Sequence, residues 1–272
     1  MPPMSSLDLG GLTLHPLDGG RMGFEVEVRG QRRRFELAVR PLLLRVGGAS
    51  IIVDPGFGPA DPERRVRFDL HDGPPLEEQC RALGLVDGPD YVLLTHLHFD
   101  HAAGALVAEG GEERARFPGA KHLCHREEWE SAQESGRGGD LAKRLERALG
   151  LEAFDWIEGE GGQVLGSLPQ LRFQKTVGHT EGLMVLEFQG EEGRCVYPAD
   201  LVPHRGFLRP KKDALADREP ERALRERERI LASAAGSGAF VWFYHDLEVV
   251  FGKLLGEKEA GVYRLDSDDS RS

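Results

Sequence analysis

Three histidines and an aspartate lie within six positions of one another at the end of a short apolar run. Residues 91–104 read YVLLTHLHFDHAAG, in which His96, His98, Asp100 and His101 form the pattern H-x-H-x-D-H. Residues two apart in an extended chain point to the same side, so His96 and His98 converge on one position. Asp100 and His101 follow where the chain turns into a helix, and they face a second position. Imidazoles and carboxylates are ligands for Zn²⁺, Fe and Mn, so this loop predicts ligands for two cations.

Three further polar residues close apolar runs elsewhere in the chain. LRFQKTVGH ends at His179, RCVYPAD ends at Asp200, and AFVWFYHD carries His245 followed by Asp246. Packing alone does not explain these positions, because an unpaired buried polar group costs roughly 1–3 kcal/mol. Strand ends are also where α/β proteins collect their ligands. We therefore predict that His179, Asp200 and His245 complete the metal site, with Asp246 as the alternative at the last strand.

The elements around these residues read as two halves of similar design. Short alternating runs between residues 12 and 54 predict a mostly antiparallel sheet, after which residues 74–85 predict a helix and residues 91–95 a buried strand. A second strand series over 171–200 is followed by an amphipathic helix over 218–236. Its charged residues are read as the solvent-facing side of that helix. This order predicts an α/β fold.

Domain boundaries and partners follow from composition. No Pro/Ser-rich linker divides the chain, so residues 1–262 are predicted to form a single domain and residues 263–272 a disordered polar tail. The net charge of -11 argues against a nucleic-acid partner. The sequence lacks a signal peptide and an 18-residue apolar run, which predicts a cytoplasmic protein with no membrane partner. The three cysteines have no C-x-x-C spacing, which predicts reduced, mostly buried thiols.

Five separated motifs resemble those of the metallo-β-lactamase-fold superfamily of metallohydrolases. IIVDPG is followed in order by THLHFDHAAG, GHTEG, YPAD and FYHD, so the resemblance extends over residues 51–246. It implies an αββα four-layer sandwich, in which two mixed sheets are flanked by helices. It also implies that the first metal is bound by His96, His98 and His179, the second by Asp100, His101 and His245, that Asp200 bridges both, and that Asp54 lies just behind the site.

The resemblance also implies a reaction. Two divalent ions, most simply Zn²⁺ with Fe or Mn as alternatives, would share a bridging hydroxide that attacks an ester-type small-molecule substrate, while Asp100 holds or passes a proton. THLHFDHAAG and PADLVPHRGFL are most similar to the quorum-quenching lactonase branch, which favours a lactone or thioester. Pro203 stands where lactonases of that branch place a substrate-binding tyrosine, and His204 is the candidate replacement. A small phosphodiesterase and an iron-dependent persulfide-dioxygenase-like oxidoreductase remain as alternatives, and nothing in the sequence fixes an oligomeric state.

Overall fold

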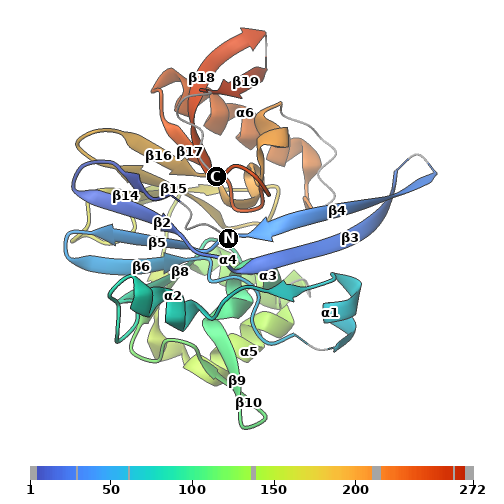
Figure 1. Ribbon diagram of the computed structural model, residues 1–272, viewed down its shortest axis with the longest axis vertical. Helices are drawn as coiled ribbons and strands as arrows, with labels where there is room; N and C mark the ends of the chain where they lie inside the picture. The colour runs from blue at the N-terminus through green and yellow to red at the C-terminus, as the bar shows by residue number, and fades with distance from the viewer. Residues whose placement is uncertain are drawn as a thin grey trace.

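The computed structural model describes residues 5–28, 30–60, 62–135, 139–209, 216–259 and 261–266. In these parts of the chain, two seven-stranded sheets lie at the centre of the molecule and helices lie on their outer sides (Figure 1). The first sheet contains, in spatial order, β1 (Leu7–Asp8), β2 (Leu12–Pro16), β5 (Leu42–Val46), β6 (Ala49–Val53), β8 (Tyr91–Leu94), β11 (Lys121–His125) and β12 (Phe154–Ile157).

The second sheet is built from the later part of the chain. Its strands are, in spatial order, β13 (Gly161–Gln163), β14 (Leu171–Thr176), β15 (Leu183–Gln189), β16 (Arg194–Tyr197), β17 (Phe240–Trp242), β18 (Phe251–Glu259) and β19 (Val262–Leu265). Both sheets are mixed: β6, β8, β11 and β12 pair in parallel in the first, and β16 pairs in parallel with β17 in the second. The remaining ladders of both sheets are antiparallel.

Smaller strands and six α-helices complete the described fold. A long hairpin of β3 (Gly20–Val28) and β4 (Gln31–Val39) pairs with β7 (His71–Asp72), and β9 (Leu106–Glu109) pairs with β10 (Glu112–Ala115). The hairpin projects from the side of the molecule (Figure 1). The helices are α1 (Pro62–Arg67), α2 (Leu76–Ala82), α3 (Phe99–Ala102), α4 (Arg126–Ser135), α5 (Gly139–Leu149) and α6 (Pro220–Gly236). The helices predicted over 74–85 and 218–236 are therefore present as α2 and α6.

Successive side chains of the buried strands point alternately into two different hydrophobic cores, one on each face of the first sheet. Ile51, Val53 and Leu93 belong to a core that also contains side chains of the second sheet, whereas Ile52 and Val92 belong to a core shared with α2, α4 and α5. Successive strand residues point to opposite faces, so a strand apolar at every position is buried on both sides. Helix α6 contributes to the first core from the side of the second sheet. The predicted αββα sandwich with two mixed sheets is confirmed.

The C-terminal segment differs from the prediction. The polar tail was predicted to begin at residue 263, but β19 continues to Leu265 and pairs with β18, and the Tyr263 side chain is buried. The alternation of Val262 to Leu265 fits an edge strand, which the acidic residues that follow concealed. Residues 267–272 of the predicted tail lie outside the described residues. Cys80, Cys124 and Cys195 are free and buried, as predicted, and no helix in the described ranges is long and apolar enough to cross a membrane.

His122 on β11 makes the stability of this fold depend on pH. The residue is 1% exposed, and neither ring nitrogen has a hydrogen-bond partner among the described residues. Burial lowers its pKa from 6.5 to about 4. As the pH falls between these values, the unfolded chain binds a proton that the folded chain excludes, so the folded state loses stability. Between about pH 7.5 and about pH 5, we expect the unfolding free energy of His122→Leu relative to that of the wild type to rise by roughly 2 kcal/mol.

Urea unfolding at about pH 5 and about pH 7.5 measures this effect as a difference between variant and wild type. Taking the difference removes the contribution of every other titrating group. The control is Gln31→Leu, because Gln31 is exposed and neither side chain carries a titratable group. If His122→Leu loses as much stability as the wild type between the two pH values, His122 does not cause the loss.

Candidate metal centre

The H-x-H-x-D-H loop begins where β8 ends. Residues 95–98 continue from the carboxyl end of the strand, and His98 has an extended backbone conformation (φ -74°, ψ 149°) immediately before α3. Asp100 and His101 lie in the first turn of α3, as the sequence predicted, and both are buried. The strand therefore delivers His96 and His98, and the helix turns Asp100 and His101 towards a neighbouring position.

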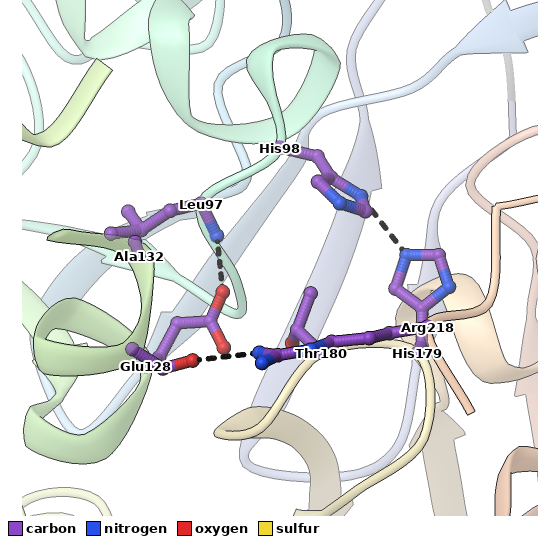
Figure 2. Close-up of a pocket in the computed structure, with 8 residues that line it drawn as sticks. Leu97, His98, Glu128, Ala132, His179, Thr180 and Arg218 are labelled. Carbon is purple, nitrogen blue, oxygen red and sulfur yellow. Dashed lines mark hydrogen bonds between the residues drawn. The ribbon is translucent and has the colours of Figure 1, made fainter. Parts of the chain in front are cut away.

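A first set of four residues surrounds one position. His96 Nε2 lies 3.1 Å from His98 Nδ1, and His179 Nε2 lies 3.0 Å from the same atom (Figure 2). Asp200 Oδ2 lies 3.2 Å from His179 Nε2. One ligand atom from each of the four residues fits within 4.8 Å of all the others. Three imidazoles and one carboxylate at this spacing form a donor set suited to a divalent cation.

A second set lies on the other side of Asp200. His101 Nε2 is 3.2 Å from His245 Nε2, and Asp100 Oδ2 is 3.4 Å from that atom. Asp200 Oδ1 lies 3.1 Å from His101 Nε2 and 3.3 Å from His245 Nε2. Asp200 therefore directs one oxygen towards each set. The structure brings all seven predicted residues together.

Asp200 provides a direct test of whether these residues fit metal ions. Its Oδ1 atom is buried and has no hydrogen bond of good geometry within the described part of the chain, although His101 Nε2 and His245 Nε2 lie 3.1 and 3.3 Å away. An ionised carboxylate oxygen in this position requires a positive partner. The neighbouring nitrogens are imidazole Nε2 atoms, which bind metals in their neutral form. A divalent ion on either side of Asp200 would satisfy the carboxylate and the imidazoles together.

Charges and burial shift the pKa values of His98 and His179 in different directions. Burial and the neighbouring His179 lower the pKa of His98 to about 4, which favours the neutral, ligating form. Burial also opposes protonation of His179, but the carboxylates of Asp200 and Asp217 outweigh it and raise the pKa of His179 to about 9. The three imidazoles facing Asp200 hold the pKa of its carboxyl well below the usual range in spite of burial. Asp200 is thus ionised and draws positive charge into the site.

Asp54 supports the site from behind, where the resemblance placed it. Its carboxylate accepts hydrogen bonds from the backbone N–H of Thr95 (2.8 Å), the Thr95 hydroxyl (2.7 Å) and the Tyr197 hydroxyl (2.8 Å). Its Oδ2 also lies 2.9 Å from His101 Nδ1. These partners occupy the carboxylate, so Asp54 is better placed to orient His101 than to bind an ion. A carboxylate on the far nitrogen of a histidine fixes the ring and leaves Nε2 as the ligating atom.

A second carboxylate of this kind was missed by the sequence analysis. Asp217 Oδ1 lies 3.1 Å from His179 Nδ1, and Arg227 donates to both oxygens of Asp217 at 2.9 and 2.7 Å. Arg227 is fully buried. The prediction that the charged residues of this helix face solvent is therefore wrong for Arg227. The available signal was its helical spacing, because Arg227 lies on the same face of α6 as Ala223 and Ile230, both buried.

The structure separates His245 from its alternative. The Asp246 carboxylate accepts hydrogen bonds from the backbone N–H groups of Glu248 and Val249, each at 3.0 Å, and so shapes the following turn. His245 instead faces Asp100, and its Nδ1 donates to the Ala38 carbonyl at 2.7 Å. Asp246 therefore stabilises the turn after His245, whereas His245 occupies the position beside Asp100.

His204 lies close to the second set in space. The carbonyl of the preceding residue, Pro203, accepts from the backbone N–H of His245 at 2.8 Å. The ring of His204 is partly buried, lies 4.9 Å from that of Phe207 and accepts a hydrogen bond from Gly206 N–H at Nδ1 (3.1 Å). None of the groups that surround the two metal positions includes it. Its substrate-binding role stays a prediction.

Comparison with known proteins agrees with this geometry. Residues 35–245 match the family model described as the metallo-beta-lactamase superfamily. A probable metal-dependent hydrolase from Staphylococcus aureus is 22% identical over 96% of this chain and 99% of its own, with a TM-score of 0.81. AidC, described as a dizinc quorum-quenching lactonase in complex with a product, N-hexanoyl-L-homoserine, is 20% identical over 97% of each chain, with a TM-score of 0.77. No curated protein sequence matches the chain.

A third structure, the hydrolase AbOPH in the β-lactamase superfamily, is 19% identical over 97% of each chain, with a TM-score of 0.75. These structures support the fold. The matched family segment contains the H-x-H-x-D-H loop, His179, Asp200 and His245, and it covers most of the sequence. The chain therefore belongs to the metallo-β-lactamase superfamily and is a metal-dependent hydrolase of that fold.

Proposed function

We propose that this protein is a dinuclear hydrolase, binding two divalent ions, with Zn²⁺ as the expected metal, and cleaving the ester-type bond of a lactone or thioester. The observation that carries the proposal is the position of Asp200. Its two oxygens face two separate donor sets, with Oδ2 at 3.2 Å from His179 Nε2 and Oδ1 at 3.1 Å from His101 Nε2. A carboxylate shared in this way would help both donor sets to hold an ion beside the same substrate bond.

The ions would supply a hydroxide nucleophile at neutral pH and polarise the substrate carbonyl. The protein's own contribution is to position groups around the reacting bond. The backbone carbonyl of Asp100 accepts from the Tyr244 hydroxyl at 2.7 Å, which holds the first turn of α3 in place. The Asp100 carboxylate is thereby kept beside His245, where it can hold a proton and pass it to the departing alkoxide or thiolate. His204 is the proposed donor to the substrate carbonyl.

The choice of a lactone or thioester has two supports. The H-x-H-x-D-H loop and the segment after Asp200 are similar to those of quorum-quenching lactonases. AidC, which has this fold, is described with a homoserine-lactone hydrolysis product bound. The bond to be cleaved joins an acyl carbon to a leaving oxygen or sulfur. Lactones and thioesters share that acyl carbon and differ only in the leaving atom.

Metal analysis followed by a substrate panel tests the proposal. The purified protein should contain about two Zn per chain. It should hydrolyse an N-acyl homoserine lactone or a glutathione thioester, and it should leave an aryl phosphodiester and a chromogenic β-lactam intact. One Fe per chain with oxygen consumption would contradict the hydrolytic mechanism. A fully metallated protein that is inactive on both acyl substrates would contradict the substrate assignment.

A further inference from the structure

Glu128 on α4 is a buried carboxylate outside both donor sets. The residue is 3% exposed and lies beside Leu97, His98 and His179 in a small pocket (Figure 2). Its burial raises the pKa of its carboxyl above the ordinary value, although the backbone N–H groups around it act in the opposite direction. A buried carboxylate is costly unless its oxygens are satisfied. The groups that donate hydrogen bonds to Glu128 therefore identify the segments that it holds in place.

Both oxygens of Glu128 accept hydrogen bonds from the backbone of metal-site loops. Oε1 accepts from Leu97 N–H at 2.9 Å, and Leu97 stands between His96 and His98. Oε2 accepts from Gly182 N–H at 3.0 Å, and Gly182 lies three residues after His179. Hydrogen bonds to an ionised carboxylate are roughly twice as strong as neutral ones. One side chain thus joins the loop of the first sheet to the loop of the second.

The first turn of α4 is also in direct contact with the loop after His179. A Cβ atom built on Gly182 would lie 2.4 Å from the backbone nitrogen of Glu128, so no side chain fits at that position. The first turn of α4 therefore packs directly on the backbone of the loop after His179. Glycine at position 182 allows this approach, which explains why the GHTEG motif ends in glycine. The distance between helix and loop is fixed by backbone contact as well as by the carboxylate.

The second donor set is held by different groups. His101 is oriented by Asp54, and His245 donates to the Ala38 carbonyl. The backbone of Asp100 is held by the Tyr244 hydroxyl. None of these contacts passes through Glu128. Glu128 therefore contacts the loops of the first set only, whereas Asp54 reaches both sets, because it also binds the Thr95 hydroxyl, which lies 3.1 Å from His96 Nδ1.

We propose that Glu128 is a positioning residue for the three-histidine set, and that loss of its paired hydrogen bonds weakens metal binding at His96, His98 and His179 alone. This rests on the proposed function only in requiring that both donor sets bind metal. In Glu128→Gln the amide keeps one acceptor oxygen but directs its NH₂ group at the second backbone N–H. One loop then loses its hydrogen bond and is pushed away, while the volume of the side chain is unchanged.

Metal titration in two backgrounds tests the selectivity. His101→Ala leaves the three-histidine set as the stronger site, and His98→Ala leaves the second set. Zn²⁺ is titrated into chelator-treated protein in competition with a chromophoric chelator. Adding Glu128→Gln should weaken Zn²⁺ binding roughly 10–100-fold in the His101→Ala background, the range for groups that orient ligands. It should change binding less than about threefold in the His98→Ala background.

Controls separate positioning from general damage to the fold. Glu130→Gln, on the exposed side of the same helix, should leave Zn²⁺ affinity unchanged in both backgrounds. If Glu128→Gln does not fold, Glu128→Asp provides the same test, because the shorter carboxylate cannot reach both loops. Hydrogen exchange of the Leu97 and Gly182 amides should accelerate in a folded variant. Equal weakening in both backgrounds, or no weakening in either, would overturn the proposal.

Failure of this inference is distinguishable from failure of the proposed function. Zn²⁺ affinity is measured without a substrate, so an inactive protein with selective weakening would leave the role of Glu128 intact. If the protein is an active hydrolase and Glu128→Gln leaves its Zn²⁺ affinities unchanged, the carboxylate only stabilises the fold.

Discussion

Asp200→Asn is expected to weaken metal binding at both donor sets and to reduce hydrolysis more than roughly 100-fold, beyond the usual effect of groups that merely orient ligands. The reason is that Asp200 faces both sets, with Oδ2 towards His179 and Oδ1 towards His101 and His245. The substitution conserves shape but removes the negative charge, and its NH₂ group faces one set as a donor. Zn²⁺ stoichiometry and competition titration measure the binding, and lactone or thioester hydrolysis measures the activity.

The contrast with other ligand variants makes this prediction specific. His98→Ala removes a ligand from one set only, so it should lose one ion and leave the other in place. Asp87→Asn serves as the charge control, because Asp87 is exposed and precedes β8, whose other end carries the metal loop. Full Zn²⁺ content and activity in a folded Asp200→Asn protein would refute the bridging role.

Arg227→Met is expected to destabilise the protein by about 3–5 kcal/mol, the typical cost of removing one partner of a buried ion pair. Arg227 and Asp217 are both fully buried as side chains, and the guanidinium holds both carboxylate oxygens. Methionine fills similar volume but leaves the Asp217 carboxylate without its cation. His179 then loses its fixed orientation, so Zn²⁺ affinity should fall together with stability. Urea unfolding with and without excess chelator separates the two effects.

A second substitution distinguishes the loss of charge pairing from poor packing. In Arg227→Met/Asp217→Asn neither charge of this pair remains, so much of the stability should return while Zn²⁺ affinity stays low. The exposed control is Arg229→Met, whose guanidinium pairs with Glu226 on the solvent side of α6 and should contribute less than about 1 kcal/mol. Equal stability losses for Arg227→Met and Arg229→Met would show that burial of the pair does not matter.

The predictability of the site depended on where each residue lies in its element. His96, His179, Asp200 and His245 all close apolar strands, and that pattern is visible in the sequence because a strand end in a buried sheet has a predictable location. Glu128 and Asp217 close no strand. Their partners are backbone amides and a histidine 31 to 54 residues away, so only the folded chain brings them together.

The fold was predictable for similar reasons, and its prediction failed for residues of a similar kind. Double-sided burial of β6 and β8 follows from continuous apolar runs, and the caps of α2 and α6 follow from proline and glycine placement. Arg227 was misplaced because a charged residue among many charged residues carries no sign of burial except its helical register. The end of β19 was missed because short edge strands differ little from polar tails in composition.

The division of ligands between the two sheets has a consequence for folding. The segment before β12 supplies His96 and His98 to one donor set and Asp100 and His101 to the other, and the segment after it supplies the remaining residues of each. Of the two donor sets, neither receives more than two ligands from one half of the chain. Tight metal binding therefore requires that the two sheets have docked. Part of the metal-binding free energy then stabilises the association of the two halves. During refolding, the appearance of high-affinity metal binding would mark the moment at which the sandwich closes.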